Sequence, residues 1–254
     1  MIKIKIIISP AKTMKIDNDD FSHRQMPAFM EESKVLSAYL KSLNYGELKS
    51  LWKTSDKLTS LNFDRIKDMD LYDNLTAAIM SFEGLQYQYM GAEVLTSSQL
   101  DYIEKHLCIL SGLYGILKPF DGIRPYRLEM ASKFSNWDYE SLYEFWGDKI
   151  SKTMLSQTKC LINLASKEYS KALIPYLNGD IEVIDCVFGE LIDGRVIQKA
   201  TLLKMARGEL VRYMAEENIK KAEDIKAFDR LGYTYREDLS HKNEYVFIKA
   251  ENQL

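Results

Sequence analysis

Residues that form disulfides or bind transition metals are scarce in this chain. The 254 residues include three cysteines and three histidines, and neither set has the short spacing of a redox motif or a zinc site. An odd number of widely separated cysteines also argues against a disulfide framework. We expect no bound metal and no cofactor, and we expect the protein to act in the cytoplasm, where thiols stay reduced.

Long apolar runs and an excess of positive charge are also lacking. The longest N-terminal apolar run, Ile6–Ile8, is too short for a signal peptide or a membrane span, so no membrane partner is expected. The formal net charge is −3, so no global basic field indicates nucleic-acid binding. Any site for a polyanion must therefore be a local concentration of lysine and arginine.

The hydrophobic patterns predict helices and strands that alternate irregularly. Strands are expected at residues 2–8, 160–164, 181–188, 196–201 and 245–249, and helices at residues 31–42, 45–54, 71–82, 98–110, 166–173 and 202–218. Asp193-Gly194 is a hairpin signal. We predict one α/β mixed (α+β) domain over residues 1–254, with a mixed β-sheet surrounded by helices, rather than a doubly wound parallel sheet.

The segment Leu110–Met130 is rich in residues that bend the backbone or carry charge. Gly112 and Gly115 precede Arg124 and Arg127 within it. Bends without a Cβ beside fixed cations can bring backbone N–H groups against a phosphate. A surface loop held by prolines is the alternative interpretation.

Two polar clusters follow predicted strands directly. The first is Ser9–Thr13, which includes Lys12, and the second is Asn163–Tyr169, which includes Ser166 and Lys167. A hydroxyl, a turn and a lysine at the end of a strand can hold an oxyanion. The alternative for the second cluster is a helix capped by Ser166 with solvated lysines.

The predicted helix at residues 202–218 carries Lys204 and Arg207 without a carboxylate three or four residues away. Arg212, by contrast, can pair with Glu209 or Glu216. Lys204 and Arg207 are therefore the better candidates for contacting an anion, although a solvated helix face would explain them too.

Residues 47–69 have the outline of a helix-hairpin-helix element, with the tight connection at Leu58–Asn62. In such elements the hairpin amides hold a DNA phosphate without reading bases. Ser60 and Asn62 occupy positions where glycine is usual, and Lys57 lies beside them. A plain pair of antiparallel helices is the alternative.

Together, motifs spread from the first to the last predicted strand resemble the YaaA peroxide stress protein family. The motifs are Ser9-Pro-Ala-Lys12-Thr13, Ser55-Asp-Lys57-Leu58, Leu110-Ser-Gly-Leu-Tyr-Gly115, Arg124-Pro-Tyr-Arg127-Leu-Glu129-Met130, Phe145-Trp-Gly-Asp148, Asn163-Leu-Ala-Ser166 and Lys204-Met-Ala-Arg207-Gly208.

The resemblance implies a fold particular to this family, with a basic cleft and a helix-hairpin-helix element. It also implies binding to duplex or branched DNA without strong sequence preference. The implied role is survival of hydrogen peroxide by limiting iron-driven DNA damage. From the matching motifs, the residues expected to contact DNA or another anion are Lys12, Lys57, Ser60, Asn62, Arg124, Arg127, Lys167, Lys204 and Arg207.

A second function remains open from the residue chemistry alone. The motifs contain more acids, amides and phenols than binding along a DNA phosphate backbone requires. This excess favours a pocket that orients a reacting group. Such an enzyme would act on a phosphorylated or nucleotide-like small molecule, in a pocket around Lys12, Arg127, Glu129 and Ser166. Glu129, Ser166 and Tyr169 are its candidate catalytic residues, although an ion pair between Glu129 and Arg127 is the commoner arrangement.

Overall fold

The apolar N-terminal segment forms the central strand of the main sheet. In the computed structural model, which describes residues 4–17, 21–135 and 137–250, strand β1 (Ile4–Ile8) is buried along its whole length. It pairs in parallel with β8 (Cys160–Leu164) on one side and β5 (Leu107–Ser111) on the other. Coverage of both faces explains why the hydrophobic pattern of β1 is nearly continuous. Residues 2 and 3 of the predicted strand lie outside the described residues.

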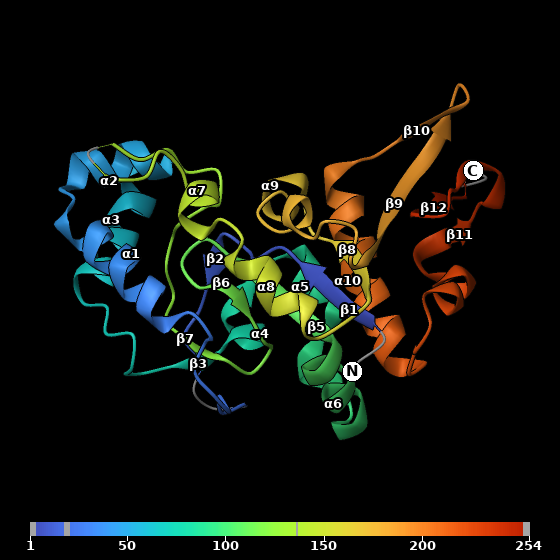
Figure 1. The fold of residues 1–254 in the computed structure, drawn as a ribbon, viewed down its shortest axis with the longest axis horizontal. Helices are drawn as coiled ribbons and strands as arrows, with labels where there is room; N and C mark the ends of the chain where they lie inside the picture. The colour runs from blue at the N-terminus through green and yellow to red at the C-terminus, as the bar shows by residue number, and fades with distance from the viewer. Residues whose placement is uncertain (1–3, 18–20, 136, 251–254) are drawn as a thin grey trace.

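The described strands build an eight-stranded sheet in the order β11-β12-β9-β8-β1-β5-β6, with β10 added to β9 (Figure 1). The remaining strands of this sheet are β6 (Gly115–Leu117), β9 (Glu182–Ile192), β10 (Arg195–Ile197), β11 (Tyr233–Tyr235) and β12 (Glu244–Lys249). The interior strands are parallel, whereas β6, β10 and β11 each pair antiparallel with a neighbour. The predicted mixed α/β architecture with a mixed sheet is therefore confirmed.

The parallel part of the sheet is more extensive than the hairpin signal suggested. Asp193-Gly194 does connect β9 to β10, but the body of β9 pairs in parallel with β8 and β12. Numbered in chain order, the parallel strands β5, β1, β8, β9 and β12 lie in the order 2-1-3-4-5. This is a common strand order of doubly wound sheets. Strand β5 is added on one side of β1, whereas β8 and the later parallel strands are added on the other side, so the strand order reverses between β1 and β8.

Helices and short ribbons surround the sheet. Helices α1 to α3 lie at the left of Figure 1, whereas α10 packs against α5 and α6, and α6 packs against β1 and β5. The helices are α1 (Met30–Ser42), α2 (Tyr45–Trp52), α3 (Asp56–Lys67), α4 (Ala78–Ser81), α5 (Leu85–Met90), α6 (Ser97–His106), α7 (Leu142–Trp146), α8 (Lys149–Leu155), α9 (Lys167–Ser170) and α10 (Ala200–Glu216). Two small ribbons pair β2 (Thr13–Met14) with β4 (Phe82–Glu83), and β3 (Thr76–Ala77) with β7 (Gly122–Ile123). Short 3-10 helices are η1 (Ala92–Val94), η2 (Ile174–Tyr176), η3 (Ala222–Ala227), η4 (Arg230–Gly232) and η5 (Glu237–Leu239).

Two predicted helices are wrong in whole or in part. Residues 71–82 form a turn, β3, α4 and the start of β4 instead of one helix, and Asn74 within this turn has φ of 48°. The helix predicted at residues 98–110 ends at His106, and the apolar run that follows is strand β5. A short, fully apolar run fits a buried strand as well as a buried helix, so periodicity could not separate them.

The glycine-rich segment after Leu110 is a buried hairpin between β5 and β6, and it is neither a phosphate loop nor a surface loop. Ser111 and Tyr114 are fully buried. The Tyr114 amide donates to Ser111 Oγ over 2.9 Å, and Trp146 Nε1 donates to the Gly112 carbonyl over 3.1 Å. Gly115 has φ of +70°, and a Cβ there would lie 2.8 Å from the Trp146 ring. These glycines therefore serve packing.

The pair of helices predicted within residues 47–69 exists, but its connection lies elsewhere. Helix α2 ends at Trp52 and is followed by Lys53, which has φ of 50°, and α3 begins after Ser55. The predicted hairpin Leu58–Asn62, including Ser60, therefore lies inside α3. The Asn62 side chain is buried and donates to the Leu58 carbonyl over 2.8 Å, so it is not available to a phosphate. The helix-hairpin-helix element is not confirmed, and the pair is two helices joined by residues 53–55.

Candidate functional site

The candidate site lies at the carboxyl ends of β1 and β8. Ser9 follows β1 and Ser166 follows β8, and the Ser166 amide donates to Ser9 Oγ over 2.8 Å. The Ser9 hydroxyl in turn donates to Ser166 Oγ over 3.2 Å. The order of the parallel strands reverses between β1 and β8, and sheets of this kind bind ligands outside the carboxyl ends of the strands at such a reversal.

Two cavities open at this edge of the sheet. The first, which we name the switch-point cavity, has a volume of about 410 Å³, and its walls include Ser9, Lys12, Gln86, Ser166, Lys204 and Arg207. The second, the β9 cleft, has a volume of about 770 Å³, and its walls include Asn163, Ser166, Lys167, Asp185 and Arg207. Ser166 and Arg207 belong to both walls, so the cavities adjoin. Volumes of this order are typical of small-molecule sites.

Helix α10 brings Lys204 and Arg207 over the switch-point cavity. Gly208 lies against the backbone of Gln86 in α5, and this close approach requires a residue without a side chain. Among the described residues, neither Lys204 nor Arg207 forms an ion pair. Arg212, in contrast, pairs with Glu216 over 2.8 Å, as the helical spacing predicted.

Arg207 is mostly buried, and its charge is poorly compensated. Its Nε has no hydrogen-bond partner in the described part of the chain. Burial lowers the pKa of Arg207 below its ordinary value, and the nearby Cys186 and Asp185 oppose this only in part. Asp185 is also occupied, because its Oδ1 accepts from Asn163 Nδ2 over 2.6 Å. A buried guanidinium in this state attracts an anion.

Glu129 is held between two cations in the lining of the switch-point cavity. Its Oε2 lies 2.7 Å from Lys12 Nζ, and its Oε1 lies 2.8 Å from Arg127 Nη2. Lys12, Glu129 and Ser166 line the switch-point cavity, whereas Arg127 lies in a small recess beside it. The four residues of the predicted pocket therefore converge, and Glu129 forms the ion pair that was the alternative to a catalytic base.

Tyr169 lines the same cavity as Glu129 and Arg207, and its side chain is a neutral phenol. It is buried, and burial raises its pKa well above 10, with a smaller contribution from Tyr126. Tyr87, which lines the same cavity, has a raised pKa for the same reason and donates to the Ser9 carbonyl over 3.0 Å. Both tyrosines are therefore hydrogen-bond donors and apolar surface at neutral pH.

The structure does not bring every predicted contact to this edge. Lys12, Lys167, Lys204 and Arg207 converge, with Arg127 beside them. Lys57 and Ser60 lie on α3, outside both cavities. Arg124 also lies outside, and its Nη1 donates to the backbone carbonyls of residues 73 and 74 over 3.4 and 3.3 Å.

Gln86 and Tyr87 are site residues that the sequence did not reveal. They lie in α5, a helix of six residues that no periodic pattern predicted. The only local sign of a site is the high content of glutamine and tyrosine in Leu85–Met90, and this composition does not by itself predict a binding function. Their place in the site follows from the packing of α5 against α10.

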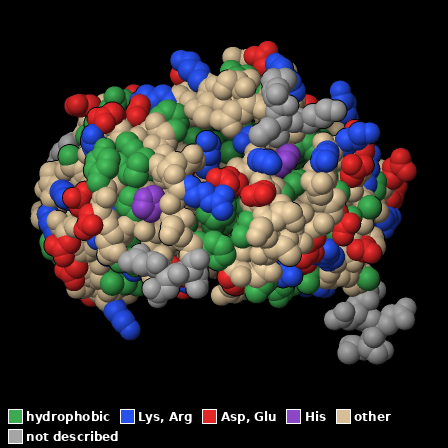
Figure 2. Space-filling model, turned by 90° about the horizontal axis from the view of Figure 1, so that it is seen from below, with side chains coloured by type: hydrophobic (Ala, Val, Ile, Leu, Met, Phe, Trp, Pro, Cys, Tyr) green, Lys and Arg blue, Asp and Glu red, His purple; other side chains and the backbone are tan. Residues whose placement is uncertain are grey.

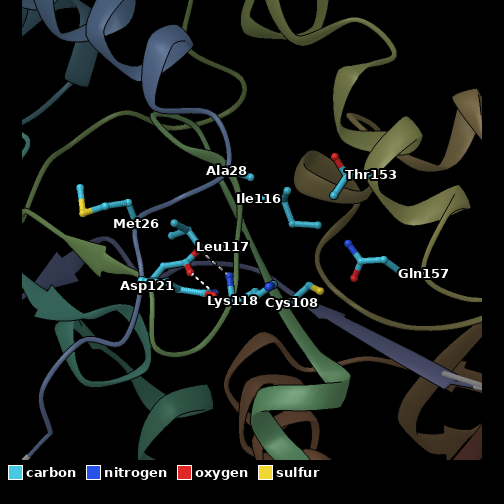
Figure 3. Close-up of a pocket in the computed structure, with 10 residues that line it drawn as sticks. Met26, Ala28, Cys108, Ile116, Leu117, Lys118, Asp121, Thr153 and Gln157 are labelled. Carbon is cyan, nitrogen blue, oxygen red and sulfur yellow. Dashed lines mark hydrogen bonds between the residues drawn. The ribbon is translucent and has the colours of Figure 1, made fainter. Parts of the chain in front are cut away.

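A further cavity, of about 260 Å³, lies next to β5 and β6 (Figure 3). Asp121 is buried in its wall and accepts from Gln25 Nε2 over 2.7 Å and from the Lys118 amide over 2.8 Å. Burial raises the pKa of Asp121 to about 6. Burial also raises the pKa of the Cys108 thiol, which disfavours a nucleophilic thiolate. The polar groups here satisfy one another, so this cavity is the weaker candidate.

Charge on the underside of the molecule, in the orientation of Figure 1, is mixed. On the underside of the view in Figure 1, acidic and basic side chains alternate without forming one basic surface (Figure 2). In the described ranges, no group of three or more histidine, cysteine, aspartate or glutamate side chains is placed to hold a metal ion. The same residues contain no helix with the length and apolar character needed to span a bilayer.

Comparison with known proteins places this chain among close relatives. The family model described as peroxide stress protein YaaA matches residues 4–239. A UPF0246 protein of Pediococcus pentosaceus is 49% identical over 248 residues, which cover 98% of this chain and 99% of the relative. A UPF0246 protein of Desulfitobacterium hafniense is 50% identical over 247 residues, covering 97% and 98% of the two chains.

Proposed function

The chain belongs to the YaaA peroxide stress protein family, and we propose that it acts in the response to hydrogen peroxide by binding DNA. Family membership supports the role in peroxide stress. The proposed DNA is duplex or branched and is bound without strong sequence preference. The proposal places the protein in the cytoplasm, where it would limit iron-driven damage to the DNA that it covers.

One observation carries the DNA contact: three exposed lysines from distant segments meet at the carboxyl edge of the sheet. Lys12 follows β1, Lys167 begins α9 after β8, and Lys204 lies on α10. Lys167 and Lys204 form no ion pair with any residue that the structure describes, so their charges are available. Lysines of this kind neutralise phosphates along a backbone.

The small net charge of the protein determines how it would bind DNA. A net charge of −3 provides no long-range attraction for DNA, so the affinity must come from this edge alone. Contacts to phosphates position a duplex without reading its bases. We therefore expect modest affinity that differs little among sequences and falls steeply as salt rises.

The test is fluorescence anisotropy of labelled duplexes of two unrelated sequences, and of a four-way junction, over a series of salt concentrations. The double variant Lys167→Ala with Lys204→Ala should weaken binding to all three DNAs alike. The slope of log affinity against log salt should flatten by about 0.9 for each lost contact.

The matched control is Lys57→Ala with Arg124→Ala, which removes the same charge outside both cavities. It should leave the affinity and the slope unchanged. An equal loss of affinity in the control would indicate that DNA contacts Lys57 or Arg124, or that the total charge alone determines the affinity. Unchanged affinity and slope in the test variant would overturn the proposal.

A further inference from the structure

The switch-point cavity contains a cation whose charge the described residues compensate only in part. Arg207 is mostly buried in its wall, and its Nε has no hydrogen-bond partner among residues 4–17, 21–135 and 137–250. Removing a charged group from water costs free energy unless an opposite charge or hydrogen bonds replace the water. The protein supplies them only in part: Asp185 lies near Arg207 but accepts a hydrogen bond from Asn163, and burial still lowers the pKa of Arg207 below its ordinary value.

A second donor in the same wall is also unsatisfied. Gln86 is only 8% exposed, and its Nε2 has no partner in the described residues. Buried donors without partners are rare in native proteins, and each one requires an explanation. Gln86 comes from α5 and Arg207 from α10, and both residues line the switch-point cavity, so two separate helices carry buried unsatisfied donors beside one cavity.

The other charged groups of the cavity are two further cations and three acids. Lys204 lies one turn before Arg207 on the same helix and forms no ion pair within the described residues. Among the acids, Glu129 is bound by Lys12 and Arg127, Glu168 accepts from the Ala131 amide over 3.0 Å, and the charge of Glu83 favours the protonated forms of Lys15 and Arg65. Helices α5 and α10 therefore bring two cations and a primary amide to the same cavity.

From these contacts we propose that the switch-point cavity binds a small phosphate monoester of nucleotide type. Arg207, Lys204 and Gln86 hold its phosphate, and the adjoining β9 cleft accommodates the rest of the molecule. The walls suit this class, since Tyr87 and Tyr169 provide apolar aromatic surface beside hydroxyl and amide groups.

This ligand is distinct from the DNA proposed above. A cavity of about 410 Å³ admits a small molecule but is too small for a duplex, which can meet only the exposed lysines at its rim. The two proposals share Lys204 but are tested with different probes and with variants at Lys167 or at Arg207 and Gln86, so either can fail while the other stands.

The test is isothermal titration calorimetry of the full chain with three probes: AMP, adenosine and inorganic phosphate. AMP should bind saturably and more tightly than phosphate, and adenosine should bind weakly, since the phosphate provides the charge. The variant Arg207→Met should weaken AMP binding at least tenfold, equivalent to about 1.4 kcal/mol. Gln86→Met, which removes only the unsatisfied amide, should also weaken it.

Stability separates a binding role from a structural one. If Arg207 is kept for a ligand, Arg207→Met removes an uncompensated buried charge and should leave the urea midpoint unchanged or raise it. Arg124→Met is the control arginine, and it should leave AMP binding unchanged.

Three outcomes would overturn the proposal. The first is no saturable binding of AMP up to about 10 mM, a concentration that detects even weak sites. The second is tighter binding of phosphate than of AMP, which would indicate an adventitious ion only. The third is full AMP affinity in Gln86→Met, a decisive result even if Arg207→Met fails to fold.

Discussion

Gly208 of α10 lies so close to Gln86 of α5 that an added Cβ would stand 2.1 Å from the Gln86 carbonyl oxygen. The obstructing atom belongs to the backbone and cannot rotate away. This approach places Arg207 and Lys204 beside Gln86 in the lining of the switch-point cavity. Packing of two helices at one glycine therefore positions the cations of the site.

Gly208→Ala should accordingly destabilise the protein, although alanine favours helices. Overpacking should cost about 1–3 kcal/mol and outweigh a helix-propensity gain of about 1 kcal/mol. Urea unfolding measures the change. The control is Gly46→Ala in α2, where the added Cβ meets only Asn44 Oδ1 at 3.4 Å. The control should be neutral or stabilising, and a neutral Gly208→Ala would contradict the close approach.

The partly buried pair of Glu129 with Arg127 predicts a larger effect than an exposed ion pair. Glu129→Gln leaves Arg127, whose side chain is 11% exposed, without its carboxylate, and should lower the free energy of unfolding by about 1–3 kcal/mol. The control is Asp148→Asn, which breaks an exposed pair with Lys152 and should cost less than about 1 kcal/mol. Equal costs in urea unfolding would refute the difference.

The same Glu129→Gln variant bears on the role of this carboxylate. Loss of its negative charge should leave DNA affinity intact or raise it, because Lys12 is released. If Glu129 were a catalytic base, the variant would fail to restore peroxide resistance to a deletion strain although it is folded and expressed. Full restoration would exclude that role.

Asp121 predicts how stability depends on pH. Its folded-state pKa of about 6 lies above the ordinary 3.8, so the folded protein binds this proton more tightly than the unfolded chain. The stability that protonation contributes is complete below about pH 4 and is lost as pH rises through about 6.

Asp121→Asn removes this dependence. Between pH 4 and pH 7, the stability of the variant should rise relative to the unmodified protein by up to about 3 kcal/mol. Urea unfolding across the pH range tests this, because lost hydrogen bonds produce a constant offset and only the titration produces a slope. A constant difference between the two proteins would disprove the raised pKa.

Several elements were predictable because their signals are local. The strand at Cys160–Leu164 has the predicted bounds, and the closing strand and the long helix that carries Lys204 differ by one or two residues. In contrast, β5 was mistaken for the end of a helix, since an apolar run of five residues carries no period. The connection at residues 53–55 was missed because Leu58–Asn62 is equally compatible with a helix.

The mixed α/β class, the family, and the polar clusters at the ends of β1 and β8 follow from the amino-acid sequence alone, because each depends on neighbouring residues or on motif order. Which cations meet depends on the three-dimensional packing: Lys12, Lys167, Lys204 and Arg207 converge, whereas Lys57 and Arg124 do not. The packing also leaves Arg207 Nε and Gln86 Nε2 without a hydrogen-bond partner among the described residues. Strand order and helix packing join segments far apart in the chain, and no local pattern encodes those distances.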